Sequence, residues 1–198
     1  MNFAPRPILL EGKLVRLEPL VEAHRAPMLA TAQQPPDVFQ YFLTDSLTKP
    51  EVFHAWFDDA LRATAAGTEV AWALVRRTDG KIVGSTRYLD IRRSNRGLEI
   101  GNTWHAREAQ RTGVNTEAKY LLLRHAFEEL GAVRVQLKTD ERNEASRRAI
   151  ARIGGQFEGI LRRYQARFDG YVRNTAMFSL VAEDWPASRA RLEALLLR

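Results

Sequence analysis

The sequence contains no cysteine. Disulfide bonds, thiolate metal sites and cysteine nucleophiles are therefore excluded. No apolar run approaches the roughly 20 residues that a membrane-spanning helix needs. The first residues also lack the basic start, long apolar stretch and small-residue cleavage site of a secretory signal. From these absences we expect a cytoplasmic protein without a membrane partner.

What is present is an ordinary globular composition of 198 residues, with 45% hydrophobic and 27% charged side chains. Such a chain supports one fair-sized core, so we expect a single domain over residues 1–198. The formal net charge of +6 favours a phosphorylated cofactor, nucleic acid or anionic lipid as partner, or belongs to a solvated surface. The arginines are spread along the chain, without a basic reading helix or an aromatic–basic stacking motif. We therefore expect no nucleic-acid partner.

Hydrophobic periodicity predicts helices that alternate with strands. Helices are expected over residues 21–33, 50–66, 114–130 and 143–153, with a last short one after Pro186. Strands are expected in KLVRLEPL, EVAWALVRR, KIVGSTRYLDI, GLEIGNTWH, VRVQLKTD, FEGILRRYQARF and YVRNTAMFSLVAEDW. Turn residues at 78–80 and 168–171 indicate two hairpins. This order predicts an α/β (α+β) fold, with a mixed central β-sheet of about seven strands flanked by helices.

The predicted strand GLEIGNTWH carries a carboxylate between two apolar residues. Strict alternation places Leu98, Ile100, Asn102 and Trp104 on one face, and Glu99, Gly101, Thr103 and His105 on the other. Glu99 then belongs either to a wet sheet face, solvated or ion-paired, or to a functional site. The strand alone leaves both interpretations open.

A polar loop with one glycine, Gln110 to Asn115, precedes the helix expected at 114–130. A helix N-terminus exposes unpaired backbone N–H groups and carries roughly half a positive charge, so it can bind phosphate. Gly113 lets the chain approach a ligand closely because it has no side chain. Alternatively, Asn115 or Thr116 is only the N-cap of this helix. The loop has neither the spacing nor the lysine of a Walker motif.

Asn143 and Ser146 lie three residues apart and share one side of the helix expected at 143–153. Asn143 suits the N-cap, with Ser146 bonding back to it, and the same pair can face a ligand. Asp140 is expected to shape the preceding turn, and Tyr164 to pack. The four histidines, at 24, 54, 105 and 125, show no ligand spacing, so no metal site is expected.

Residues 99–163, from EIGNTWH to EGILRR, resemble the GNAT acyl-coenzyme A N-acetyltransferases. They are most similar to the branch that includes the ribosomal-protein-alanine N-acetyltransferases, and the likeness extends from LEGKLVRLEPL to EDWP. The family's phosphate motif, Gln/Arg-x-x-Gly-x-Gly/Ala, reads Gln110-Arg111-Thr112-Gly113-Val114-Asn115 here. Asn115 departs from the small last residue, and many relatives have glycine where Arg111 stands. The segments NTEA, TDERNEAS and EGILR match the family pattern well.

The resemblance implies a GNAT fold with acetyl-CoA as co-substrate. The residues that it assigns to acetyl-CoA are Trp104, His105, Gln110, Arg111, Thr112, Gly113, Val114, Asn115, Thr116, Asn143 and Ser146. Backbone groups at Trp104 and His105 would contact the thioester or pantetheine, without need of the imidazole. Glu99 would be the base, directly or through a water, and Ser146 would protonate or solvate the departing thiolate. An amine would attack the thioester directly, without a covalent enzyme intermediate.

The acceptor is not selected by the resemblance, because the branch acts on protein N-termini and on small-molecule amines. Residues 33–49 and 165–174 are expected to line the acceptor pocket, with Tyr41, Phe42, Arg163 and Arg173 as candidates. A homodimer is also expected from this branch. The alternative function is a non-catalytic acyl-CoA-binding sensor or scaffold on the same fold, which the altered position Asn115 permits.

Overall fold

The computed structural model describes residues 3–197, through which one eight-stranded sheet runs. The strands are β1 (Leu10–Glu11), β2 (Val15–Pro19), β3 (Val70–Arg76), β4 (Ile82–Arg92), β5 (Gly97–His105), β6 (Arg134–Asp140), β7 (Gln156–Ala166) and β8 (Val172–Val181). The α-helices are α1 (Arg25–Ala32), α2 (Pro50–Ala65), α3 (Val114–Arg124), α4 (Glu144–Arg152) and α5 (Trp185–Leu196). Short 3-10 turns lie at Glu22–His24, Pro36–Phe39, Arg107–Ala109 and Ala182–Asp184, and a π-helical turn, His125–Glu129, extends α3.

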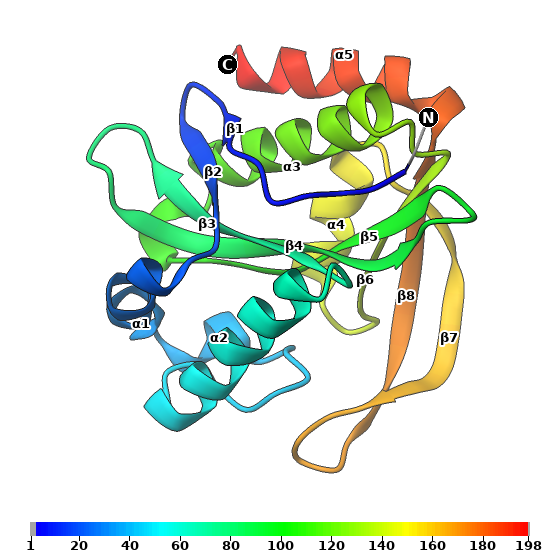
Figure 1. Cartoon of the computed structure of the whole chain (residues 1–198). Helices are drawn as coiled ribbons and strands as arrows, with labels where there is room; N and C mark the ends of the chain where they lie inside the picture. The colour runs from blue at the N-terminus through cyan, green and yellow to red at the C-terminus, as the bar shows by residue number, and fades with distance from the viewer. Residues whose placement is uncertain (1–2, 198) are drawn as a thin grey trace.

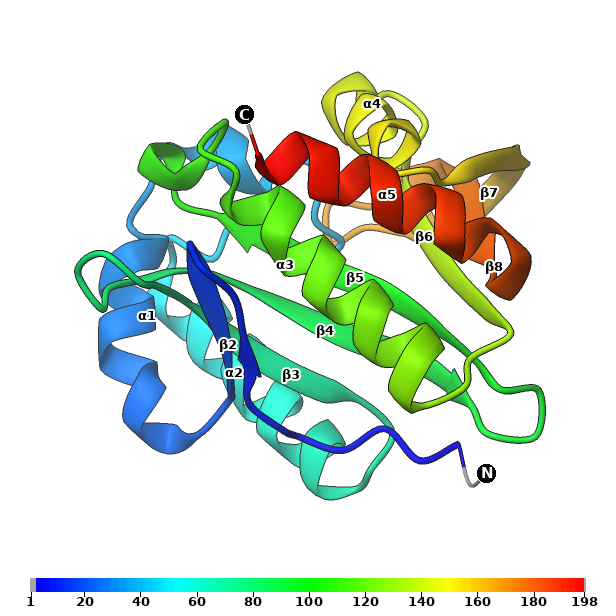
Figure 2. The same ribbon diagram turned by 90° about the horizontal axis from the view of Figure 1, so that it is seen from above.

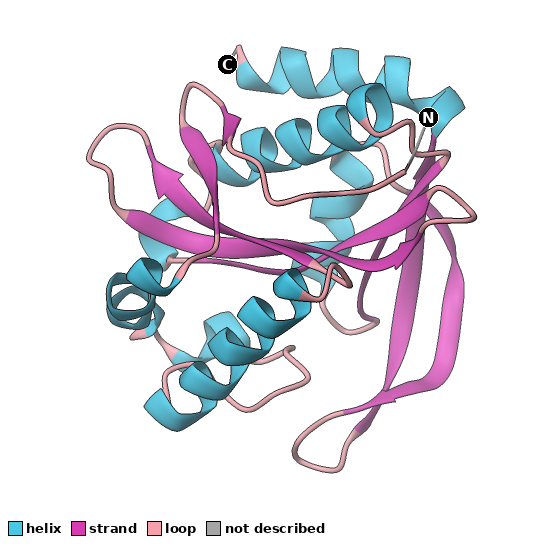
Figure 3. Ribbon diagram, viewed as in Figure 1, coloured by secondary structure: helices cyan, strands magenta, loops and turns pink. Residues whose placement is uncertain are grey.

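Helices cover both faces of the sheet (Figures 1 and 2). α3 and α5 lie side by side on one face, and α1 and α2 lie on the other. The strand order is β1-β2-β3-β4-β5-β6-β8-β7, and every neighbouring pair is antiparallel except β5 with β6. The β7–β8 hairpin extends beyond the rest of the sheet on the side of α2 (Figure 3). None of the helices in residues 3–197 has the length and apolar character needed to cross a membrane.

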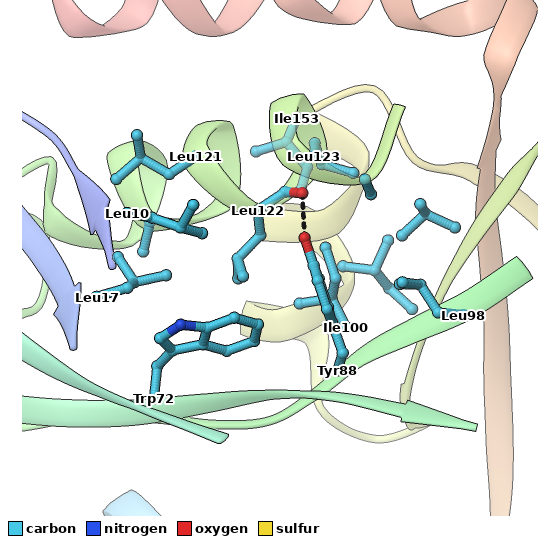
Figure 4. Close-up of a cluster of buried hydrophobic side chains, with 14 of the residues drawn as sticks. Leu10, Leu17, Trp72, Tyr88, Leu98, Ile100, Leu121, Leu122, Leu123 and Ile153 are labelled. Atoms are coloured by element: carbon cyan, nitrogen blue, oxygen red, sulfur yellow. Dashed lines mark hydrogen bonds between the residues drawn. The ribbon is translucent and has the colours of Figure 1, made fainter. Parts of the chain in front are cut away.

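Each face of the sheet buries its own hydrophobic cluster. Under α3, Trp72 and Tyr88 meet edge to face with ring centroids 4.9 Å apart, and Leu121 and Leu122 pack nearby (Figure 4). The Tyr88 hydroxyl donates to the Leu122 carbonyl at 2.5 Å, so this buried polar group is satisfied. The second cluster lies against α1 and α2 and includes Trp104. Burial of each such large side chain contributes about 1.5–3 kcal/mol.

The helices and both hairpins expected from the sequence are confirmed, but the strand count is one too low. The additional strand is β1, which has only two residues and pairs with Leu17 and Arg16 of β2. Two residues are too short for any periodicity to be visible in the sequence.

The expected alternation along β5 is wrong after Gly101, because the strand contains a β-bulge. Gly101 pairs with Arg87 and Trp104 pairs with Ser85, so two residues of β5 oppose the single residue between them on β4. Asn102 takes the left-handed conformation there, with φ of 51°. A bulge exchanges the faces of the residues that follow it. Trp104 therefore joins the cluster against α2, whereas Leu98 and Ile100 remain in the cluster under α3.

A buried carboxylate ties α3 to the first hairpin, a role that the sequence did not indicate. Glu117 is 5% exposed and accepts backbone N–H bonds from Lys13, Leu14 and Val15 at 2.8, 2.6 and 2.8 Å. Three charge-assisted bonds to one carboxylate fix the turn between β1 and β2 against α3.

Replacing Glu117 by Gln should lower the free energy of unfolding by at least about 2 kcal/mol. The amide keeps one acceptor oxygen, and its NH₂ group must face backbone donors. Urea denaturation would measure the loss, with Glu108→Gln on the exposed turn at Arg107–Ala109 as control. An equal, small effect of both substitutions would contradict this role of Glu117.

Candidate active site

The central feature of the site is a cleft that opens where β5 leaves β6. The two parallel strands pair at Gly97–Arg134, Leu98–Val135 and Glu99–Gln136, and no ladder pair of the described residues continues beyond Glu99. The cleft has a volume of about 1530 Å³. Its walls come from residues 99–105 of β5, residues 137–139 of β6, and parts of α2, α3, α4, the loop 37–45 and the β7–β8 hairpin.

Glu99 lies at the point of divergence and is 3% exposed. Its Oε2 lies 2.9 Å from Lys138 Nζ and accepts a bond from Gln136 Nε2 at 3.3 Å. Gly101 leaves room for this carboxylate, since a Cβ there would lie 2.7 Å from Glu99 Oε1. Burial excludes the solvated alternative for Glu99, whereas the ion-paired alternative holds, with Lys138 as the partner. Glu99 is a buried, ion-paired carboxylate in the wall of the cleft.

The loop before α3 presents backbone N–H groups, as the phosphate interpretation requires. α3 begins at Val114, its N-cap is Gly113 with φ of 87°, and no side chain caps its first turn. The alternative that Asn115 or Thr116 is the N-cap is therefore wrong. A φ of 87° is free of strain only for glycine. Arg111, two residues before Gly113, also has a positive φ, of 62°.

The side chains of this loop divide into two groups. Gln110 and Asn115 line the cleft, together with Trp104 and His105 at the end of β5. Thr112 donates to the Ala109 carbonyl at 2.7 Å, and Thr116 accepts from Arg152 of α4 at 3.2 Å. These two hydroxyl groups hold the loop and α4 in place. The Arg111 side chain is exposed outside the cleft wall, and Val114 is buried in the core under α3.

His105 is held neutral by its surroundings. Its Nε2 lies 2.9 Å from Asn115 Oδ1, and its Nδ1 is buried without a partner in the described residues. Burial lowers the pKa of His105 to about 4, which outweighs the bond with Asn115, and the nearby Lys119 acts in the same direction as burial. Since Asn115 Oδ1 can only accept, Nε2 carries the proton and Nδ1 is left as an acceptor.

On α4, Asn143 is the N-cap and accepts from the Ser146 backbone N–H at 3.0 Å, as expected. Both residues also line the cleft, where Ser146 is half-buried. Asp140 shapes the preceding turn by accepting from the Arg142 backbone N–H at 3.0 Å. Tyr164, which was expected to pack, is exposed on β7, and the Nζ of Lys138 lies 5.4 Å from the centroid of its ring.

The acceptor candidates do not all reach the cleft. Tyr41, Phe42 and Arg173 line it, whereas Arg163 lies on an exposed part of β7 outside the cleft wall. Within residues 3–197 no three metal-binding side chains gather in one place.

Two lysines of the site were missed from the sequence. Lys138 shares its face of β6 with Gln136, two residues before it, and alternation could have indicated this. Lys119 lies one helical turn after Asn115, is 7% exposed, and donates to Thr103 Oγ1 at 2.7 Å. Burial lowers the pKa of Lys119 to about 7. It forms no ion pair with any described residue.

Comparisons with known proteins identify the family to which this fold belongs. The acetyltransferase (GNAT) domain family matches residues 15–156. The chain belongs to the GNAT acetyltransferase family. YoaA of Bacillus subtilis, an uncharacterised N-acetyltransferase, is 29% identical over 112 residues, which span 57% of this chain and 62% of that relative.

Solved structures show the same fold over nearly the whole chain. A candidate acetyltransferase from T. thermophilus is 36% identical, with a TM-score of 0.86 over 97% of this chain and 98% of that chain. RimJ of Mycobacterium smegmatis, solved in complex with CoA-disulfide, is 22% identical, with a TM-score of 0.78 over 96% of this chain and 95% of that chain. At that identity, the RimJ comparison shows the fold alone.

Lys119→Met should change how stability depends on pH. The unfolded lysine keeps its proton up to its ordinary pKa of 10.5, whereas the folded one releases it near pH 7. Between these values the unfolded state binds more protons, so the free energy of unfolding rises with pH. Wild type should therefore gain stability relative to Lys119→Met from about pH 7 to about pH 10.

Urea denaturation over this pH range would measure the difference. Lys81→Met is the matched control, because it removes an exposed lysine of the β3–β4 turn and no buried charge. Parallel curves for wild type and Lys119→Met would show that Lys119 is not the source of the dependence.

Proposed function

We propose that the chain is an acetyl-CoA-dependent N-acetyltransferase that transfers an acetyl group directly to a primary amine. The observation that carries this proposal is the cleft between β5 and β6. Its wall contains Asn115, in the uncapped first turn of α3, and the buried carboxylate of Glu99. The same proposal includes the cytoplasmic location expected from the composition and the homodimer expected from the resemblance.

The residues at the α3 end of the cleft fit a coenzyme A arm. The first-turn N–H groups of α3 would bind the pyrophosphate, with Gln110 and Asn115 beside them. Two buried atoms without partners in the described residues, His105 Nδ1 and Trp104 Nε1, also belong to residues of the cleft wall. Buried polar atoms in proteins are normally hydrogen-bonded, so unpaired ones in a cleft favour a ligand there.

Bound acetyl-CoA would supply the acetyl thioester. Glu99 would take a proton from the ammonium group of the acceptor, directly or through a water, since an alkyl ammonium must lose its proton before it attacks. Backbone N–H groups near Trp104 and His105, on the edge of β5 that β6 leaves free, would stabilise the oxyanion. Ser146 of α4, half-buried in the cleft wall, would protonate or solvate the departing thiolate.

Binding of acetyl-CoA is tested by calorimetric titration of wild type and Gly113→Ala. Wild type should bind, and Gly113→Ala should bind at least about tenfold more weakly, because an L side chain disfavours φ of 87° and moves the N–H groups. Gly80→Ala is the matched control, since Gly80 has φ of 70° in the β3–β4 turn with open space around it. Absence of binding to wild type would overturn the proposed function.

The role of Glu99 is tested with Glu99→Gln in acetyl-transfer assays on a panel of peptide N-termini and small amines. We expect kcat to fall by at least about 100-fold, while the Kd of acetyl-CoA is unchanged. Glu51→Gln at the exposed rim of the cleft is the control. A kcat of Glu99→Gln equal to that of wild type at every pH would remove Glu99 from the mechanism. Binding of acetyl-CoA with no transfer to any amine would favour a sensor.

A further inference from the structure

At the end of the cleft formed by the β7–β8 hairpin lies a buried arginine without an ion-pair partner. Arg173 of β8 is 6% exposed and lines the cleft. Its three hydrogen bonds go to neutral oxygen atoms: Thr175 Oγ1 at 3.2 Å, the Tyr41 carbonyl at 3.3 Å and Gln165 Oε1 at 2.8 Å. Among residues 3–197, no carboxylate lies within ion-pairing distance of its guanidinium.

The two carboxylates that act electrostatically on Arg173, those of Asp140 and Glu99, are already paired with other cations. Asp140 is held by Arg142 through two side-chain bonds of 2.9 Å, and Glu99 is paired with Lys138. Burial lowers the pKa of Arg173, Asp140 and Glu99 act in the opposite direction, and Arg167 adds to the lowering. A buried charge without a contacting counter-ion destabilises the folded protein. A ligand that supplies the counter-ion would remove this cost.

Arg173 still has donors to offer to a ligand. An arginine carries five N–H donors, and three are used in the bonds given above, which leaves two. Arg167 strengthens the positive potential at this end. Its Nε is buried without a partner in the described residues, and its closest carboxylate contact, with Asp169, is 3.7 Å.

We propose that Arg173 binds a carboxylate of the acceptor, so that the acceptor class is small amines that carry a carboxylate close to the amine, such as free amino acids. The planar guanidinium fork matches the geometry of a carboxylate. Arg173 and Glu99 line the same cleft, so one small acceptor can lie between the two groups. Aromatic side chains of Tyr41, Phe42 and Phe168 line the same end of the cleft.

This inference rests on the proposed function, and its test uses matched acceptors. The trio is L-phenylalanine, L-phenylalaninamide and 2-phenylethylamine, with glycine, glycinamide and methylamine as a second set. Binding to CoA-saturated wild type is measured by calorimetry, and kcat and KM are measured with acetyl-CoA. The carboxylated amine should bind at least about tenfold more tightly than its amide, because a charge-assisted bond is made only by the carboxylate. The amide has the less basic amine, so intrinsic reactivity cannot produce this preference.

The variants separate binding of the acceptor from a structural role. In Arg173→Gln the KM for the carboxylated amine should rise at least about tenfold, with a smaller change for the amide. Arg173→Lys should retain part of the preference, and Arg162→Gln on the exposed face of β7 should retain all of it. A purely structural role would change the KM for both amines equally.

The outcomes are distinct for the two proposals. If wild type binds acetyl-CoA but acetylates amides at least as well as carboxylated amines, the proposal that Arg173 binds a carboxylate is overturned. The proposed function is then unaffected. The same holds if no carboxylated amine binds to the CoA-saturated protein. Failure of acetyl-CoA to bind would overturn the proposed function itself.

Discussion

The site depends on one constraint, the separation of β5 from β6 after Glu99. Each of these strands keeps a partner on its other side, since β5 pairs with β4 and β6 pairs with β8. The sheet can therefore open between them at the cost of a single short ladder. Those backbone groups of residues 100–105 that do not bond to β4 are left facing the cleft, where a ligand can satisfy them. The opening passes between strands, so it joins the two faces of the sheet.

The bulge at Asn102 divides the chemistry between these faces. Glu99 precedes the bulge and points away from the cluster under α3 that holds Leu98 and Ile100. Thr103 and His105 follow it and contact α3 through Lys119 and Asn115. Without the bulge, these residues would share one face with Glu99. The carboxylate therefore faces the α2 side, and the polar groups beside the α3 N-terminus face the other.

Local signals in the sequence were sufficient for most of the fold. The turn glycines, the cap at Asn143 and the periodicity of the helices act over a few residues, and each was confirmed. The positions that failed depend on distant partners. β1 exists only because β2 holds it, and the bulge at Asn102 is visible only in the unequal pairing with β4. Glu117 acquires its role from the amides of Lys13 to Val15, about a hundred positions away.

The candidate site divides in the same way, into residues with local sequence signals and residues whose roles depend on distant partners. The loop Gln110–Asn115 and the pair Asn143–Ser146 were identified because their motifs are contiguous. Only the structure shows that Gly113 is the N-cap of α3, because Asn115 and Thr116 were also suitable N-caps in the sequence. The sequence did not predict the role of Lys138, because this residue of β6 pairs with Glu99 on the neighbouring strand β5. No local pattern distinguishes a buried cation from an exposed one when its burial is produced by other elements.

The buried cations themselves separate structure from function. Arg87, 1% exposed, is matched by the Glu69 carboxylate at 3.0 Å and the Trp56 carbonyl at 3.0 Å, and it lies outside the cleft wall. Lys119 and Arg173 are nearly as buried, lack contacting carboxylates among the described residues, and both line the cleft. The charge of Arg87, outside the cleft, is thus neutralised by the carboxylate of Glu69. Lys119 and Arg173 have no such partner among the described residues, so an anionic ligand in the cleft would stabilise either cation.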